Sequence, residues 1–467
     1  MNGLAVVTVG SFATEQNFMT CGMVGSLERN IQYRTAIEEL RKWKDKKAKK
    51  PLIIRGARQV GKTWLMKEFG RTDYDRAVYV NFDNNRPMKA LFSADMDVRR
   101  ITAGLELYTN QKIDPANTLL IFDEVQEVPQ ALSSLKYFNE LAPEYQIICA
   151  GSLLGTALHH GTSFPVGKVE FLDLYPLSFS EFMLAVKKEK FAALLHEYNF
   201  AMVTAFKHEY IELLKKYYFI GGMPEAVMSF IEDESYGGVR EIQRRILDAY
   251  EQDFSKHAPN EVVPKIRMLW NSIPSQLAKE NKKFIYGAVK EGARAREYEL
   301  ALLWLSDCGL VHKVNRAAAP KLPLKAYEDL KAFKLFIVDV GLLACMTGLD
   351  KKILMEGNDL FKEFKGALTE QYVLQQMKTM KGINVYYWTN DRGGAEIDFL
   401  IDNGSNVIPV EVKAETNLQA KSLKTFYEKF KPETSVRISM SDYKDEGWLK
   451  NLPLYAADNI SRYADLA

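Results

Sequence analysis

Cysteine is scarce in this chain, and the few that occur are scattered. The 467 residues include four cysteines, and none of them forms a Cys-x-x-Cys pair, the spacing typical of zinc or redox motifs. Cys149 stands in an apolar run that reads as a strand. This distribution argues against a disulfide scaffold or a zinc site and favours free thiols in a reducing compartment.

The chain also lacks long apolar runs and an excess of either charge. No stretch of about 18 apolar residues occurs, so we expect no transmembrane helix and no membrane partner. Residues 4–12 are mildly apolar but short and without a basic flank, which argues against a signal peptide and favours a cytoplasmic protein. The formal net charge is only +2, so any nucleic-acid site has to be a local patch.

Apolar and aromatic residues, by contrast, are plentiful, at 47% and 12% of the chain, which is enough for several packed cores. The length itself predicts about three domains. A coherent pattern begins only near residue 27. We therefore treat residues 1–26 as an N-terminal extension, within which Met23 is an alternative start.

The most informative stretch predicts a strand, a glycine loop and a helix in succession. Residues 51–55 (PLIIR) read as a short buried strand, residues 56–63 read GARQVGKT, and residues 64–69 have a helical pattern. This is G-x-x-x-x-G-K-[ST] in the context that a phosphate-binding loop requires. Glycines let successive backbone N–H groups point at phosphate oxygens, and the helix N-terminus adds a positive dipole. The predicted nucleotide-binding residues are Gly56, Ala57, Arg58, Gln59, Val60, Gly61, Lys62, Thr63 and Trp64.

Two acids follow the next clear apolar run, at residues 119–122. Such a run favours a strand buried on both faces of a parallel sheet, and ligands bind beyond the carboxyl ends of such strands. We expect Asp123 and Thr63 to hold Mg²⁺ and Lys62 to reach the β and γ phosphates. Glu124 would orient and deprotonate the attacking water, so the sequence predicts ATP and Mg²⁺ as cofactors.

A third catalytic candidate, Ser152, follows the strand predicted at residues 146–150. In P-loop ATPases, the strand beside the metal-binding strand often ends in a polar residue that touches the γ-phosphate or the water. The alternative is a plain turn serine.

Helical periodicity dominates residues 181–253, with a break at residues 221–225 (GGMPE). Ser178 or Ser180 would cap the helix expected to begin near Glu181. A helical segment after an ATPase core commonly acts as a lid on the nucleotide. We therefore expect an ATPase core at residues 27–180 and a helical lid at residues 181–258.

Several motifs together resemble a family of prokaryotic AAA-type ATPases whose members carry a C-terminal domain of unknown function. The resemblance spans nearly everything after residue 27 and implies ATP binding by residues 56–63, with hydrolysis supported by Asp123 and Glu124. The motifs are residues 56–63, 121–126 (IFDEVQ), 150–152 (AGS), 175–182 (YPLSFSEF), 221–224 (GGMP) and 338–342 (VDVGL).

The resemblance also bears on a cation that would stabilise charge in the transition state. In similar proteins an arginine often follows the glycine that we place at Gly167, whereas this chain has Lys168. Lysine is the weaker substitute because it lacks the planar fork of a guanidinium group. Arg58, inside the loop, is the other candidate.

Residues 259–348 have the outline of a winged helix. Helical patterns at residues 262–277 and 295–308 precede a strand pattern at residues 310–314. Arg294 and Arg296 would begin the second helix, where DNA readers often contact phosphate. Two arginines give little positive charge for a DNA reader, so a winged-helix fold used for protein contacts or packing is favoured.

Residues 349–467 carry a second group of charged candidates. Glu370 lies in a helical stretch, Asp398 in a predicted strand, and Glu411 and Lys413 in the next, where residues two apart share a face. The carboxylate of Glu411 beside the ammonium of Lys413, with Asp398 on the neighbouring strand, could hold Mg²⁺ and polarise a water. The pattern resembles the PD-(D/E)XK nuclease superfamily, and an active nuclease and an inert nuclease-like fold both stay open.

The sequence thus predicts an α/β protein with a P-loop NTPase parallel sheet and helical lid, a winged-helix-like domain and a restriction-endonuclease-like α/β domain. We expect ATP hydrolysis with Mg²⁺, coupled to C-terminal domains that act on DNA or a protein partner. One alternative is a nucleotide-gated DNA-binding switch with an inert nuclease fold. The other is a Mg²⁺-dependent DNA nuclease with regulatory ATP. The oligomeric state is left open.

Overall fold

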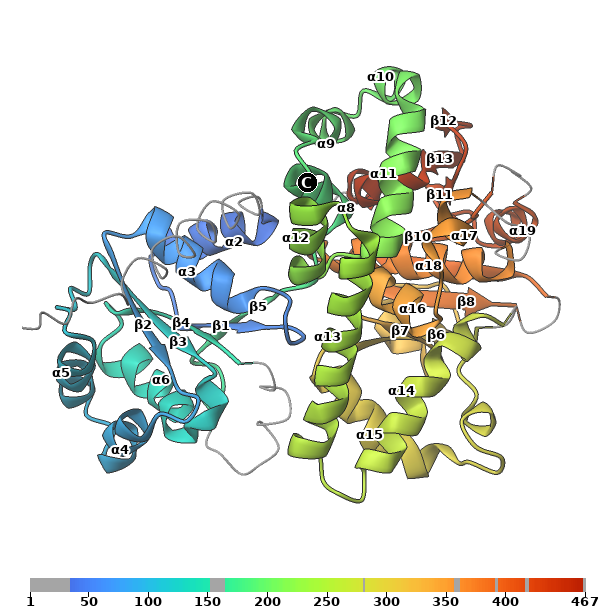
Figure 1. Ribbon diagram of the computed structural model, residues 1–467. Coiled ribbons are helices and arrows are strands. Elements are labelled where there is room, and N and C mark those ends of the chain that lie inside the picture. The colour runs from blue at the N-terminus through green and yellow to red at the C-terminus, as the bar shows by residue number, and fades with distance from the viewer. Residues whose placement is uncertain are drawn as a thin grey trace, which may run out of the picture.

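The computed structural model describes residues 34–151, 164–279, 282–356, 362–390, 394–415 and 420–464 (Figure 1). The extension at residues 1–26 and the catalytic candidate Ser152 lie outside these residues. In the described part of the chain, no helix is long and apolar enough to cross a membrane.

Five parallel strands form the N-terminal sheet. They are β1 (Leu52–Arg55), β2 (Arg76–Asn81), β3 (Thr118–Asp123), β4 (Gln146–Ala150) and β5 (Glu170–Asp173). Their order is β2-β3-β4-β1-β5, and every neighbouring pair is parallel. The predicted parallel P-loop-type sheet is therefore confirmed, and the carboxyl ends of β1 and β3 lie on either side of β4.

Helices cover both faces of this sheet because successive strand residues point to opposite sides. One face carries α2 (Thr35–Lys44) and α3 (Lys62–Asp73), and the other carries α4 (Arg86–Ala94), α5 (Val98–Thr109) and α6 (Pro129–Leu141) (Figure 1). Ile121 of β3 belongs to the same core as Phe69 of α3. The next residue, Phe122, packs instead against Phe92 of α4, with ring centroids 5.9 Å apart. Burial on both faces explains the unbroken apolar run in β3.

A series of helices follows the first sheet. They are α8 (Phe179–Ala185), α9 (Glu189–His196), α10 (Phe200–Ala205), α11 (Lys207–Ile220), α12 (Pro224–Asp233) and α13 (Tyr236–His257). Ser178, one of the two predicted caps, forms a capping box with Glu181, so α8 begins two residues earlier than expected. Ser180 instead donates a hydrogen bond to Asp458, near the C-terminus.

The C-terminal half is built on a second, mixed sheet. It begins with α14 (Val263–Leu277), α15 (Ala295–Asp307), β6 (Val311–Ala317) and β7 (Glu328–Ile337), in the helix–helix–strand order that the sequence predicts. The remaining elements are η2 (Val125–Glu127) in the first lobe and, in the second, η3 (Tyr286–Ala288), η4 (Leu324–Tyr327), α16 (Val340–Met346), α17 (Lys351–Glu356), α18 (Lys362–Lys378), β8 (Asn384–Thr389), β9 (Glu396–Asp402), β10 (Val407–Val412), α19 (Lys421–Phe430), β11 (Ser435–Ser439), β12 (Lys444–Asp445), β13 (Leu449–Pro453) and η6 (Leu454–Ala464).

This second sheet crosses the boundary that the sequence places after residue 348. The strand order is β12-β13-β11-β10-β9-β8-β6-β7, and β6 pairs with β8 at Arg316 and Tyr387. The strands of the expected winged-helix-like and nuclease-like segments therefore share one sheet.

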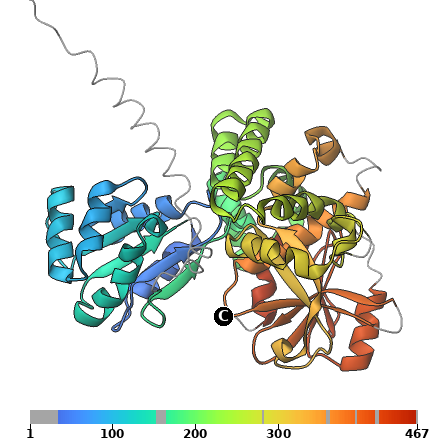
Figure 2. The same cartoon turned by 90° about the horizontal axis from the view of Figure 1, so that it is seen from below.

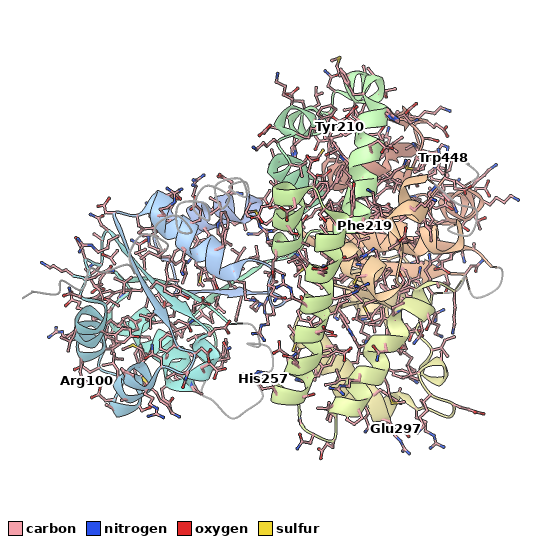
Figure 3. The ribbon with its side chains drawn as sticks, in the orientation of Figure 1. Arg100, Tyr210, Phe219, His257, Glu297 and Trp448 are labelled. Carbon is pink, nitrogen blue, oxygen red and sulfur yellow. The ribbon has the colours of Figure 1, made fainter. Side chains whose placement is uncertain are left out.

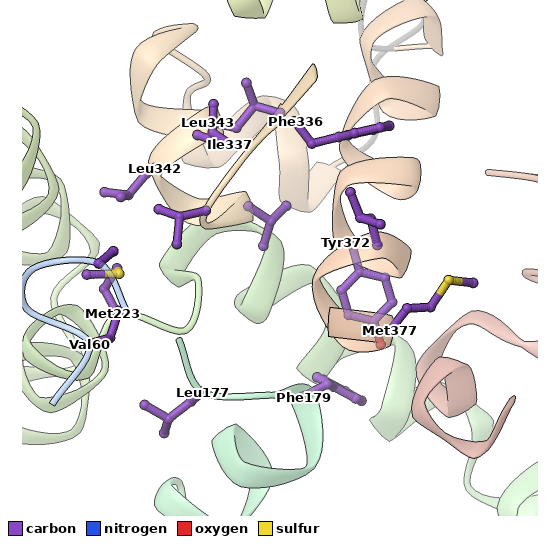
Figure 4. Packing of buried hydrophobic residues seen from close by; sticks show 14 of the residues in the cluster. Val60, Leu177, Phe179, Met223, Phe336, Ile337, Leu342, Leu343, Tyr372 and Met377 are labelled. Atoms are coloured by element: carbon purple, nitrogen blue, oxygen red, sulfur yellow. The ribbon is translucent and has the colours of Figure 1, made fainter. Parts of the chain in front are cut away.

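The two sheets form two lobes, but one hydrophobic core runs between them (Figure 2). The core extends from Ile37 in α2 to Ile460 in η6. Figure 4 shows Val60 of the glycine loop beside Met223, at the start of α12. The loop predicted to bind phosphate is thus packed against the helices that follow the first sheet.

Candidate functional site

The glycine loop, residues 56–61, joins the end of β1 to the start of α3. Gly56 has φ 145° and Gly61 has φ 94°, backbone conformations that favour glycine. A Cβ atom on Gly56 would lie 2.1 Å from the carbonyl oxygen of Leu174. The first N–H groups of α3 have no partner within the helix, so the predicted loop presents donors where an anion can bind.

Lys62 is held in place at this loop by two carbonyl groups. Its Nζ donates to the carbonyl oxygens of Gly56, at 2.9 Å, and Ala57, at 2.8 Å, and the residue is only 6% exposed. An ammonium group has three N–H donors, so one is left for a phosphate. Burial lowers the pKa of Lys62 to about 8, against the opposing charges of Glu124 and Asp123. At neutral pH the residue is therefore charged and already positioned.

Thr63 and Asp123 meet between the loop and the end of β3. The hydroxyl of Thr63 donates to Asp123 Oδ2 at 2.6 Å, and Asp123 is 3% exposed. Hydroxyl and carboxylate oxygens are the hard ligands that Mg²⁺ takes, together with phosphate and water. The residues present therefore fit a magnesium ion of the kind that P-loop proteins bind. No described set of three or more His, Cys, Asp or Glu could hold a metal ion, so phosphate and water would have to complete this coordination.

Tyr79 is a neighbour of Asp123 that the sequence reasoning missed. Its hydroxyl donates to the same Oδ2 atom at 3.0 Å, from β2, the strand next to β3. Burial and the charge of Asp123 raise the pKa of Tyr79, so the phenol stays a hydrogen-bond donor. The sequence signal was a tyrosine among the apolar residues 77–80.

Glu124 occupies a turn immediately after β3. Its φ is 52°, in the left-handed region that is uncommon for residues other than glycine and is enriched at functional sites. Gln126 Nε2 donates to Glu124 Oε2 at 2.6 Å. This contact orients the predicted base. Gln126 belongs to the motif at residues 121–126, but the sequence alone assigns it no role.

The other predicted residues of this site are distributed as follows. Trp64 is partly buried on α3. Arg58 and Lys168, the two candidate cations, are both engaged elsewhere, Arg58 with Asp253 at 2.6 Å and Lys168 with Glu140 at 2.9 Å.

Helices α12 and α13 and the segment after α15 all touch the glycine loop. A Cβ on Gly61 would lie 3.5 Å from Pro224, and a Cβ on Gly309 would lie 3.1 Å from the backbone nitrogen of Ala57. The hydroxyl of Tyr250, on α13, donates to the carbonyl oxygen of Arg58 at 2.9 Å. His257 lies at the end of α13 (Figure 3), and burial lowers its pKa. The loop is therefore where the two lobes meet.

The second glycine motif, at residues 221–222, forms a hub beside this loop. Gly222 donates its N–H to Asp339 Oδ2 at 2.6 Å and accepts from the N–H of Leu177 at 2.7 Å. Gln375 donates to the same oxygen of Asp339 at 3.0 Å. A Cβ on Gly221 would lie 2.1 Å from Asp339 Oδ1, so the motif needs glycine there. Motifs at residues 175–182, 221–224 and 338–342 thus converge next to the glycine loop.

The four residues of the predicted second site also gather in the C-terminal lobe. Lys413 Nζ lies 2.9 Å from Glu411 Oε1, as their shared strand face predicts. Asp398 Oδ2 accepts from the N–H of Val412 at 2.7 Å. Burial and the charge of Glu370 raise the pKa of Asp398 to about 7.

Two lysines that the sequence reasoning missed belong to the same cluster. Lys334, 1% exposed, lies 3.6 Å from Glu370 and 2.5 Å from Glu396, and Lys282 also pairs with Glu370. The ammonium groups of Lys282 and Lys334 compensate the negative charge of Glu370, which a metal ion would otherwise use as a ligand. Glu370, paired with both lysines, is therefore not open to a divalent cation as arranged.

Three stretches of the chain match known protein families. A model described as an AAA domain matches residues 48–183, which include the glycine loop, Asp123 and Glu124. The N-terminal lobe is an AAA-type P-loop domain. Two domains of unknown function, DUF8612 and DUF4143, match residues 211–353 and 365–456. The family resemblance stated from the sequence is confirmed, and a nucleotide is the ligand class of the AAA-type domain.

Comparison with individual proteins adds little. No curated protein matches the chain. Similar solved structures include the Walker-type ATPase PABY2304 of Pyrococcus abyssi, which is 13% identical, with 69% of this chain and 95% of that chain covered and a TM-score of 0.42. The Aeropyrum pernix ORC1 protein, solved in complex with DNA, is 12% identical, with 69% and 92% covered and a TM-score of 0.26. Likeness at this level carries no argument about function.

Proposed function

We propose that the AAA-type domain binds ATP with Mg²⁺ and hydrolyses it. The observation that carries the proposal is the 2.6 Å contact between Thr63 and Asp123, because it joins the end of the glycine loop to the end of β3. This puts two oxygen ligands for Mg²⁺ beside the N–H donors of the loop and the ammonium of Lys62.

Each residue then has a defined task. The loop N–H groups and Lys62 bind and orient the β and γ phosphates, and bound Mg²⁺ supplies neutralising charge there. Glu124 accepts a proton from a water that attacks the γ-phosphorus. The bond from phosphorus to the bridging oxygen breaks, and the products are ADP and inorganic phosphate.

A matched pair of threonines on α3 tests this assignment. Thr63→Ala removes the hydroxyl at Asp123 and should lower Mg²⁺-dependent phosphate release roughly 10-fold or more, about 1.4 kcal/mol in the barrier. Thr72→Ala removes an exposed hydroxyl that bonds Glu68 and should leave the rate unchanged. Lys62→Ala should abolish nucleotide binding or turnover. Equal rates in wild type, Thr63→Ala and Lys62→Ala would sink the proposal.

We further propose that the nucleotide state reaches the C-terminal half and controls its action on DNA or a protein partner. The contacts of Pro224, Gly309 and Tyr250 with the loop support this coupling, since a change in loop shape displaces them directly. Salt-sensitive DNA binding that differs between ATP-bound and nucleotide-free protein is the expected result for the DNA case. Identical binding in both states argues for a protein partner.

The cluster around Glu370 supports an inert nuclease-like fold over an active nuclease. The pairs that Lys282 and Lys334 make with Glu370 are the observation that favours this alternative. With Mg²⁺ and a panel of DNA forms, we expect no strand cleavage. Cleavage that disappears in both Asp398→Ala and Lys413→Ala would instead establish a nuclease.

A further inference from the structure

We infer that Arg58 is a movable cation of the nucleotide site that Asp253 holds away from the phosphates until ATP binds. Its transfer from Asp253 to the phosphates couples nucleotide binding to α13. This inference rests on the proposed function of the glycine loop, and it adds a regulatory contact to that site.

The contact itself is tight and asymmetric. Arg58 Nη1 lies 2.6 Å from Asp253 Oδ1, and the Asp253 side chain is 7% exposed whereas that of Arg58 is 48% exposed. Among the described residues, Arg58 is the hydrogen-bonding and ion-pair partner of Asp253. Tyr250, one turn earlier on α13, holds the carbonyl of Arg58 at 2.9 Å. One face of α13 therefore contacts both the backbone and the side chain of a single loop residue, Arg58.

Burial makes this pair costly to separate. A carboxylate that loses its cation while staying buried is strongly unfavourable. Arg58 can therefore leave only if α13 shifts enough to bring water to Asp253. The pair between Arg55 and Asp173, next to the same loop, has both side chains more than 40% exposed, so its separation places no such demand on the fold.

Arg58 is also the loop cation that is free to move. Lys62 is fixed by the carbonyls of Gly56 and Ala57, whereas the Arg58 guanidinium is half exposed. A guanidinium group binds phosphate with two parallel hydrogen bonds, and Arg58 belongs to the loop whose N–H groups cradle the phosphates. Asp253 and the phosphates of ATP thus compete for the same side chain.

The test measures the affinity for a non-hydrolysable ATP analogue with Mg²⁺ in full-length variants. Asp253→Asn removes the competitor, so the analogue should bind about fivefold tighter or more. In an Arg58→Gln background the same Asp253→Asn change should have no effect. Arg245→Gln breaks an exposed ion pair with Glu225 on the same helix and is the control that should leave affinity unchanged.

Other results would overturn the inference in distinguishable ways. Weaker binding by Asp253→Asn shows that Asp253 supports the site, and equal tightening without Arg58 shows that it acts through another group. If wild type and every variant fail to bind the analogue, the nucleotide site itself is refuted. Hydrogen exchange in the wild type needs no variant to fold: the analogue should speed amide exchange in the last turns of α13, and unchanged exchange contradicts the switch.

Discussion

At the residue scale, the surroundings of Lys62 fix the position of its ammonium group and lower its pKa. The same burial that directs Nζ to the carbonyls of Gly56 and Ala57 lowers its pKa to about 8. An unfolded lysine has a pKa near 10.4. The folded, nucleotide-free protein therefore loses this charge in mildly alkaline solution, where the unfolded chain keeps it.

The pH dependence of nucleotide binding should report this residue. Affinity for an ATP analogue should be full below pH 7 and fall as the pH rises through about 8, because only the ammonium form attracts phosphate. Between about 8 and 10.4 the unfolded state binds more protons, so the contribution of Lys62 to the free energy of unfolding rises with pH while affinity falls. Calorimetric titration from pH 6.5 to 9.5 measures the effect. Lys62→Arg should bind without this pH step, and a step that persists belongs to another group.

Two glycines with positive φ offer a matched test of the loop. Gly56→Ala places a Cβ 2.1 Å from a backbone oxygen, whereas Gly404→Ala, in the turn between β9 and β10, meets nothing within 4 Å. The second change should cost about 1 kcal/mol for the left-handed backbone alone. The first should cost at least about 3 kcal/mol in the free energy of unfolding, measured with urea, and should reduce nucleotide binding. Equal costs would mean that β5 and the loop separate easily.

At the element scale, the N-cap of α16 is an aspartate that also bonds two other segments. These are the turn before α12 and the helix α18. Asp339, fully buried, accepts hydrogen bonds from Leu342 N–H at 3.0 Å, from Gly222 N–H and from Gln375. Burial raises the pKa of Asp339, and these donors oppose the shift. An ordinary cap such as Asp97, at the exposed start of α5, accepts a hydrogen bond from Arg99 N–H of its own helix at 2.9 Å.

The two caps should therefore differ in what their loss costs. Asp97→Ala removes one exposed cap, worth about 1 kcal/mol of the free energy of unfolding. Asp339→Ala leaves several buried donors without a partner and should cost about 3 kcal/mol or more. Urea unfolding of both variants measures the difference. Similar losses would show that the hub around Gly222 adds nothing beyond capping.

At the scale of the whole molecule, the shared core makes the two lobes dependent on each other. Phe179, after the first sheet, packs on Tyr217 of α11 and on Tyr372 of α18, with ring centroids 5.6 and 6.1 Å apart. All three rings are fully buried in the core that also contains Val60 of the glycine loop. A change that destabilises one lobe therefore also disturbs the packing of the shared core, and with it the stability of the other lobe.

Thermal unfolding should accordingly be a single transition. A ligand that binds only the native state stabilises the whole cooperative unit, so the ATP analogue should raise the midpoint of the entire transition. Scanning calorimetry of the full chain, with and without analogue and Mg²⁺, makes the measurement. Two resolved transitions, of which the analogue moves only one, would show that the lobes unfold independently.

The features that could be predicted from the sequence are those that depend on residues close together in the chain. The loop at residues 56–63 and the acids at the end of β3 follow from glycine spacing and apolar runs, which act within a few residues. Their meeting follows too, because carboxyl ends of parallel strands share one edge of a sheet. Glu411 and Lys413 were placed together for the same local reason, the alternation of side chains along a strand.

What only the tertiary structure decided are contacts between segments far apart in the chain. The bond from Arg58 to Asp253 spans 195 positions, and Lys334 of β7 reaches Glu370 of helix α18. No periodicity encodes such partners, because they depend on how all the elements pack at once. The sequence by itself determined the nucleotide loop and its acids through backbone sterics and hydrophobic alternation. The tertiary structure decided which residues contact that loop, because a buried charge is paired only when segments distant in the chain pack together around it.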